Sequence, residues 1–138
     1  MPQVHINYLA VVVAAAAAFL IGGLWYSPLL FAKQWVKAHG YTEENVNEMQ
    51  KSAGKAYAIS ILCHLLIALA IAVLVGYLHL ALCMQGLKLG ALIWAGFAFP
   101  LGLMANAFSD KRITAFAIDA GYQLVYLLIM GSIITVWQ

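Results

Sequence analysis

Long runs without charge constrain this chain more than any other feature. No Lys, Arg, Asp or Glu occurs in residues 1–32, 56–87 or 89–109, and residues 113–138 contain only Asp119. A helix that spans a bilayer needs about 20 consecutive, mostly apolar residues, and each run is long enough for one. The sequence therefore predicts an all-α, polytopic membrane protein. Its single domain, 1–138, is expected to have four transmembrane helices at roughly 7–27, 56–79, 86–108 and 113–136.

The composition supports the same class. Hydrophobic residues make up 65% of the chain and charged residues 9%, whereas a soluble domain has roughly half and a quarter. In 138 residues that much apolar surface does not fit inside one water-soluble core. The predicted partner is therefore the lipid bilayer. No basic cluster is dense enough to predict nucleic-acid binding.

The basic residues predict the orientation. Six of the seven fall in two predicted loops, 28–55 and 109–112. These six are Lys33, Lys37, Lys51, Lys55, Lys111 and Arg112, and only Lys88 lies on the other side. Because short cytoplasmic loops are enriched in Lys and Arg, we expect both of these loops in the cytoplasm and both termini outside.

The stretch "LWYSPLLFAKQW" marks the end of the first predicted helix. Aromatic residues gather at membrane interfaces, and a proline redirects the chain. The predicted interfacial residues are Trp25, Tyr26, Ser27, Pro28 and Trp35. Apolar and polar residues alternate over 29–39, which favours a short helix along the cytoplasmic interface that Gly40 can end. Thr42 is a good N-cap for a further short helix before the second span.

A polar stripe interrupts the last apolar run. In "FAIDAGYQLVYLL", Asp119, Tyr122, Gln123 and Tyr126 fall at i, i+3, i+4 and i+7, which is one face of a helix. A central Asp costs about 2.5–3.5 kcal/mol to insert into a membrane, so such residues usually face protein or water. The stripe is therefore the first candidate for a functional site.

The second predicted helix has a stripe of its own, formed by Tyr57, Ser60 and His64. His64 lies about 13 Å along its helix from Lys55, and Asp119 lies about 10 Å from Arg112. These similar depths indicate that His64 and Asp119 are able to meet. With Asn106 from the third helix, they predict a polar cluster in the cytoplasmic half, built from all four helices.

Three functions fit such a cluster. The favoured one is a homo-oligomeric ligand-binding or transport module, which takes a small polar, amphipathic or lipid ligand or passes protons. The alternative is a small membrane enzyme that acts on a lipid or quinone-like substrate, with His64 as base and Asp119 orienting it. The third is a scaffold, in which polar contacts only join helices. The absence of any catalytic motif favours the first.

Other sequence features limit these functions further. His64 and Asp119 are too few ligands for a metal site, and no phosphate loop, dinucleotide fingerprint or haem motif occurs, so no cofactor is predicted. Gly86 and Gly90 have the GxxxG spacing, and the first predicted helix is rich in alanine. Close packing explains such small-residue faces, and they are able to supply contacts between copies. Pro100 is expected to kink the third helix.

Several segments resemble one known family. They are residues 7–11, Trp25 to Phe31 with Lys33 and Trp35, Gly121 to Leu124, and Met130 with Gly131. With the Trp-Tyr-Ser-Pro segment as the most specific, the chain resembles a family of small bacterial membrane proteins catalogued as a domain of unknown function, family 1761. The resemblance implies a four-helix protein of the bacterial inner membrane and carries no activity.

Overall fold

The computed structural model describes residues 3–109 and 112–138, and its architecture is all-α. Four helical stretches are long and apolar enough to cross a membrane. They are α1 (Tyr8–Trp25), α4 (Ala53–Tyr77), the run Cys83–Ala107, and α7 (Ile113–Val136). Each overlaps the span predicted for it, so the four-helix prediction is confirmed. Asp110 and the predicted loop residue Lys111 lie outside the described residues.

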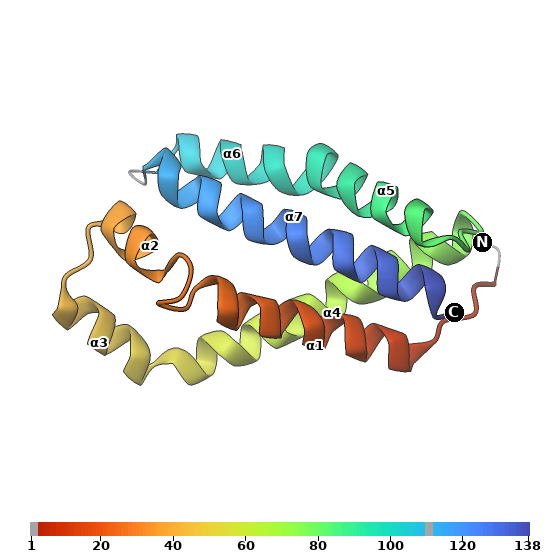
Figure 1. Ribbon diagram of the computed structural model, residues 1–138, viewed down its shortest axis with the longest axis horizontal. Coiled ribbons are helices and arrows are strands. Elements are labelled where there is room, and N and C mark those ends of the chain that lie inside the picture. Colours follow the sequence, from red (N-terminus) through yellow and green to blue (C-terminus); the bar gives the residue numbers. More distant parts are fainter. Residues whose placement is uncertain (1–2, 110–111) are drawn as a thin grey trace.

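The four spans run up and down along one long axis (Figure 1). Both chain ends lie at one end of the bundle, which we call the termini end. The other end, the loop end, carries the short helices α2 (Ala32–His39) and α3 (Glu43–Lys51) and the start of α7. Among the spans, α7 is central, because it packs against α1, α4 and α5.

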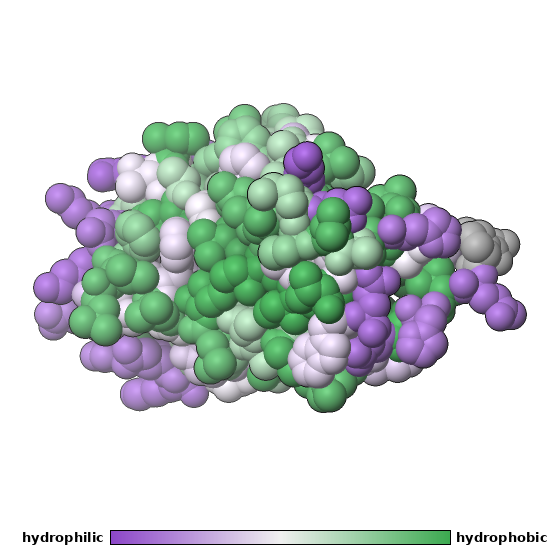
Figure 2. All heavy atoms as spheres, turned by 45° about the vertical axis from the view of Figure 1, so that its right-hand side comes forward, coloured by the Kyte–Doolittle hydropathy of each residue, from purple (hydrophilic) through white to green (hydrophobic). Residues whose placement is uncertain are grey.

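The surface fits a bilayer environment. Figure 2 shows a broad hydrophobic band across the middle of the molecule, with hydrophilic side chains gathered towards its two ends. Large apolar side chains of the spans are exposed, among them Leu66 at 58%, Leu92 at 66% and Leu101 at 60%. In water such exposure has a large unfavourable free energy, whereas lipid tails solvate it. The chain is a multi-pass membrane protein.

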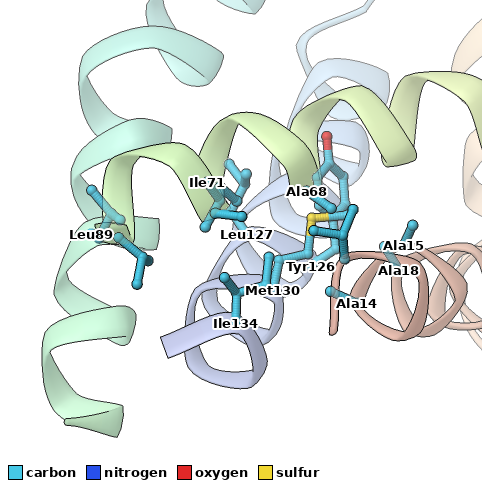
Figure 3. Close-up of a cluster of buried hydrophobic side chains, with 13 residues drawn as sticks. Ala14, Ala15, Ala18, Ala68, Ile71, Leu89, Tyr126, Leu127, Met130 and Ile134 are labelled. Atoms are coloured by element: carbon cyan, nitrogen blue, oxygen red, sulfur yellow. The ribbon is translucent and has the colours of Figure 1, made fainter. Parts of the chain in front are cut away.

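The packed core lies in the termini half of the bundle. Small residues of α1 and α4, including Ala14, Ala18 and Ala68, are fully buried. Figure 3 shows the α1 alanines on one side of Met130 of α7, and Leu127 of α7 beside Ile71 of α4. Small side chains let helix backbones approach closely, so that van der Waals contact replaces the hydrophobic effect that is absent between helices in lipid.

The glycines of the third span also pack inside the chain. A Cβ on Gly86 would lie 2.2 Å from the carbonyl oxygen of Gly131, and one on Gly90 would lie 2.4 Å from that of Leu127. Both glycines therefore serve the contact between α5 and α7. Gly86, Gly90 and the buried alanines of α1 are thus used within one molecule, whereas contact between copies stays a prediction.

The third span differs from the prediction in its shape. It begins at Cys83 rather than near 86, and consists of α5 (Cys83–Ile93), the π-helical turn η1 (Trp94–Ala98) and α6 (Phe99–Ala107). The N–H of Phe99 donates to the carbonyl of Trp94, five residues back. The wide turn directly before Pro100 accommodates a residue that lacks an N–H. The distortion expected at Pro100 thus takes the form of a π-helical turn.

The short helices begin and end as their capping residues predict. Gly40 ends α2 in the left-handed conformation, with φ of 69°. The Thr42 side chain accepts a hydrogen bond from the Asn45 N–H and so caps α3. Of the interfacial helix predicted over 29–39, only Ala32–His39 is α-helical, because residues 28–31 form a turn.

Candidate functional site

Asp119 is the centre of the first group of polar contacts. One of its oxygens, Oδ1, accepts two hydrogen bonds, from the Tyr26 hydroxyl at 2.5 Å and from the Trp35 indole N–H at 3.2 Å. Tyr26 follows the last residue of α1, and Trp35 belongs to α2. The carboxyl group of α7 is therefore held by the loop end of α1 and by a helix outside the spans.

Tyr26 remains a hydrogen-bond donor at neutral pH. Burial raises the pKa of the Tyr26 phenol, and the hydrogen bond and negative charge of Asp119 raise this pKa further. Deprotonation would place a second negative charge against the carboxylate in a partly buried site. The Tyr26–Asp119 contact is therefore stable to pH well above the ordinary range of a tyrosine.

Aromatic rings attach α2 to this site. Trp35 packs against Tyr26 with ring centroids 6.1 Å apart, and against His39 at 4.1 Å. His39 stacks on Tyr41 at 5.0 Å. Ala38, on the same helix, is buried. Because α2 contacts α7 directly, it forms part of the site as well as covering the end of the bundle.

His64 forms a second polar group, deeper in the bundle. It is only 6% exposed, and its Nε2 lies 3.0 Å from the Tyr122 hydroxyl, which donates its proton to the Ala18 carbonyl at 2.7 Å. With that proton used, Nε2–H must donate to the Tyr122 oxygen. The Ser60 hydroxyl, 3.3 Å from Nδ1, then donates to the other nitrogen. Neutral His64 is therefore fully hydrogen-bonded within the protein.

The structure does not form the expected pair of His64 and Asp119. Within the described residues, His64 bonds to Ser60 and Tyr122, whereas Asp119 bonds to Tyr26 and Trp35. Depth counted along each helix ignores tilt, and the loop half of α4 diverges from α7 (Figure 1). Tyr122, one turn deeper than Asp119, meets His64 instead. The rings of Tyr26 and Tyr122, 5.5 Å apart, are the contact between the two groups.

Two tryptophans fix the rotation of α7 beside the site. The Trp25 indole donates to the carbonyl of Ile118 at 3.0 Å, and that of Trp94 donates to the carbonyl of Ala120 at 2.9 Å. Gly121 leaves room for Trp25, since a Cβ there would lie 3.1 Å from its ring. Donors from α1 and η1 thus hold the turn of α7 that carries Asp119.

A cavity of about 180 Å³ lies between α6 and α7 at the loop end. Its apolar wall includes Gly102, Ala105 and Phe116, and its polar wall includes Asn106, Ser109, Asp119 and Gln123. Asp119 therefore belongs both to the cavity and to the hydrogen bonds with Tyr26 and Trp35. Asn106 and Gln123 are both half-buried, so each side-chain amide is partly accessible from the cavity.

The remaining predicted residues have no part in the hydrogen bonds of Asp119 and His64. Tyr57 is 58% exposed, and its ring forms a T-shaped pair with that of Phe19, with centroids 5.9 Å apart. Tyr126 is buried in the core, where its ring lies 5.1 Å from that of His64. Pro28 is exposed, and the Ser27 hydroxyl bonds locally to the Leu24 carbonyl. The described chain contains no group of three His, Cys, Asp or Glu residues placed to hold a metal ion.

Sequence reasoning missed Trp94 and the cavity wall formed by Ala105 and Phe116. The signal for Trp94 was present, because an indole N–H at the middle of an apolar run requires an acceptor. Ala105 and Phe116 carry no such signal, because their role follows only from the way α6 packs on α7.

Comparison with known proteins gives one match. The model of the family described as "Protein of unknown function (DUF1761)" matches residues 9–135, nearly the whole chain. No curated protein and no solved structure matches this chain. The matched region includes the Asp119 contacts, the His64 contacts and the cavity. Because the match extends through all four spans and includes these residues, the chain belongs to the DUF1761 family.

Proposed function

We propose that this protein is a membrane-embedded binding module, and that its small polar or amphipathic ligand occupies the cavity between α6 and α7. One observation carries the proposal: Asp119 lines that cavity while both of its hydrogen bonds fall on Oδ1. Among the described residues, neither of these two bonds uses the second oxygen, Oδ2, and we assign it to the ligand. A carboxyl group held in place by two donors has little freedom to lose on binding.

The rest of the cavity supports the same function. Ligand sites combine apolar walls with a few polar groups that orient the ligand, and here Phe116 faces the same space as Gln123 and Asn106. A helix-joining role accounts for Tyr26 and Trp35 but gives no reason for an open space beside the carboxyl group. The enzyme alternative requires His64 next to Asp119, which is not the arrangement found.

Transport by a homo-oligomer of the bacterial inner membrane, with the loop end in the cytoplasm, is the second candidate. It is favoured by the placement of the polar groups, which all lie in the loop half, where a ligand would enter. The termini half is closed by the apolar core around Met130. Passage through the molecule therefore requires rearrangement or a path between copies, so binding is the simpler function.

Native mass spectrometry from nanodiscs of one synthetic phosphatidylcholine tests the proposal. We expect the wild type to carry a bound molecule whose mass differs from that lipid. Ala105→Phe fills the cavity without touching the Asp119 contacts and should remove this mass. Ala107→Phe, on the same exposed helix end but outside the cavity wall, should keep it. A mass that persists in Ala105→Phe, or is absent from the wild type, would contradict the proposal. The same spectra give the copy number.

A further inference from the structure

The charge balance of the cavity indicates which class of ligand it takes. Resting on the binding function proposed above, we infer that the ligand is a small organic cation, a protonated amine with an apolar body of about one ring, whose ammonium group binds Asp119. The inference follows from the charge of the site, the acceptors around it, and the size and lining of the cavity.

In its ionised form, Asp119 has no described counter-ion. Its two partners, the Tyr26 hydroxyl and the Trp35 indole, are neutral donors, and no ion pair involves it in the part of the chain that the structure describes. Hydrogen bonds from neutral donors orient a carboxylate but leave its net charge in place. A negative charge within a membrane span is costly unless a cation pairs with it. A cationic ligand would supply that pairing, whereas an anionic one would be repelled.

The neighbouring polar groups match an ammonium group. Its three N–H donors need three acceptors, and the cavity wall includes Asp119, Gln123 and Asn106, whose side chains carry one carboxylate and two amide acceptors. An ammonium group therefore finds one charged and two neutral acceptors. Charge-assisted hydrogen bonds of this kind are roughly twice as strong as neutral ones.

The apolar wall of the cavity limits the size and shape of the apolar part of the ligand. The volume of about 180 Å³ is comparable to an engineered cavity of about 150 Å³ that binds benzene. Phe116 forms one side and is supported by the ring of Phe99, 5.4 Å away. Gly102 keeps this side open, because a Cβ there would lie 3.1 Å from the Phe116 ring. One ring on a short chain fits this space.

A pair of matched probes tests the inference. 2-Phenylethylamine is protonated at neutral pH, as alkylamines such as Lys are, whereas 2-phenylethanol has nearly the same shape and no charge. Binding of each is measured by titration calorimetry on the protein in phosphatidylcholine nanodiscs, with empty nanodiscs subtracted. We expect the wild type to bind the amine at least about tenfold more tightly. Asp119→Asn should reduce the affinity for the amine to that for the alcohol.

Each outcome separates this inference from the proposed function. Equal binding of the two probes by the wild type would overturn the amine inference without any variant, and so would a preference that survives in Asp119→Asn. Ala105→Phe should bind neither probe, and Ala107→Phe should bind both as the wild type does. If neither probe binds but the wild type still carries a mass that Ala105→Phe loses, the amine class is wrong and the binding function stands. If the wild type neither binds a probe nor carries a mass, both are wrong.

Discussion

The two halves of the bundle are held together in different ways. In the termini half, buried alanines and the glycine contacts between α5 and α7 bring helix backbones together. In the loop half, hydrogen bonds and aromatic rings around Asp119 and His64 join the helices, and a cavity remains open. The first ten residues of α4, at the loop end, contain no buried side chain, whereas the helix has five buried residues from His64 onward.

This difference separates stability from binding. Helices in lipid gain little from the hydrophobic effect, so close contact between small residues has to hold them. The termini half has that contact, and the loop half can therefore be less densely packed and carry polar groups that would weaken a bundle on their own. We expect substitutions in the termini half to change mainly stability and those in the loop half to change mainly binding.

Gly90→Ala should give the largest loss of stability. A Cβ at this position would lie 2.4 Å from a backbone oxygen of Leu127, which cannot move aside as a side chain can. Overpacking of this kind costs roughly 1–3 kcal/mol, and we expect the upper part of that range. Unfolding free energies from steric trapping in bicelles would measure it. The matched control is Gly96→Ala in the same span, since a Cβ there meets nothing within 4 Å. Equal losses for both variants would contradict the close-packed contact.

Tyr122→Phe should have a smaller effect on stability. It removes the hydroxyl that joins His64 to the Ala18 carbonyl. Hydrogen bonds between membrane helices average about 0.6 kcal/mol, with a maximum near 1.7, and we expect about 1 kcal/mol because two contacts are lost. The same unfolding measurement applies, with Tyr57→Phe as control because Tyr57 is exposed. A loss as large as that of Gly90→Ala would mean that the two halves do not differ as described.

The sequence predicts one part of this structure well and another poorly, for a physical reason. Charge-free runs locate the spans, and Gly40 and Thr42 correctly predict where α2 ends and α3 begins. All of these features depend on residues that are neighbours in sequence. Periodicity also places Asp119 and Tyr122 on one face of α7. It gives no tilt, however, so it pairs His64 with Asp119 rather than with Tyr122. Nor does it show that α2 turns back onto the bundle.

The contact between Tyr26 and Asp119 gives the smallest expected effect, which depends on pH. Burial and Asp119 raise the folded-state pKa of Tyr26 above its ordinary value of 10.0. Above about pH 10 the unfolded chain loses the Tyr26 proton, whereas the folded protein keeps it. The stability contributed by Tyr26 is therefore complete below about pH 10 and falls as the pH rises further. The slope is at most about 1.4 kcal/mol per pH unit, and the partial exposure of Tyr26 reduces it.

Tyr26→Phe removes this titration. The difference in unfolding free energy between wild type and variant should therefore shrink between about pH 9 and about pH 11. Tyr8→Phe is the control, since Tyr8 is 68% exposed and its difference from the wild type should stay constant. If the Tyr26→Phe difference also stays constant, the carboxyl group does not act on this phenol. The loop half would then be held by packing alone, as the termini half is, and Asp119 would lose one of the two donors that orient it towards a ligand.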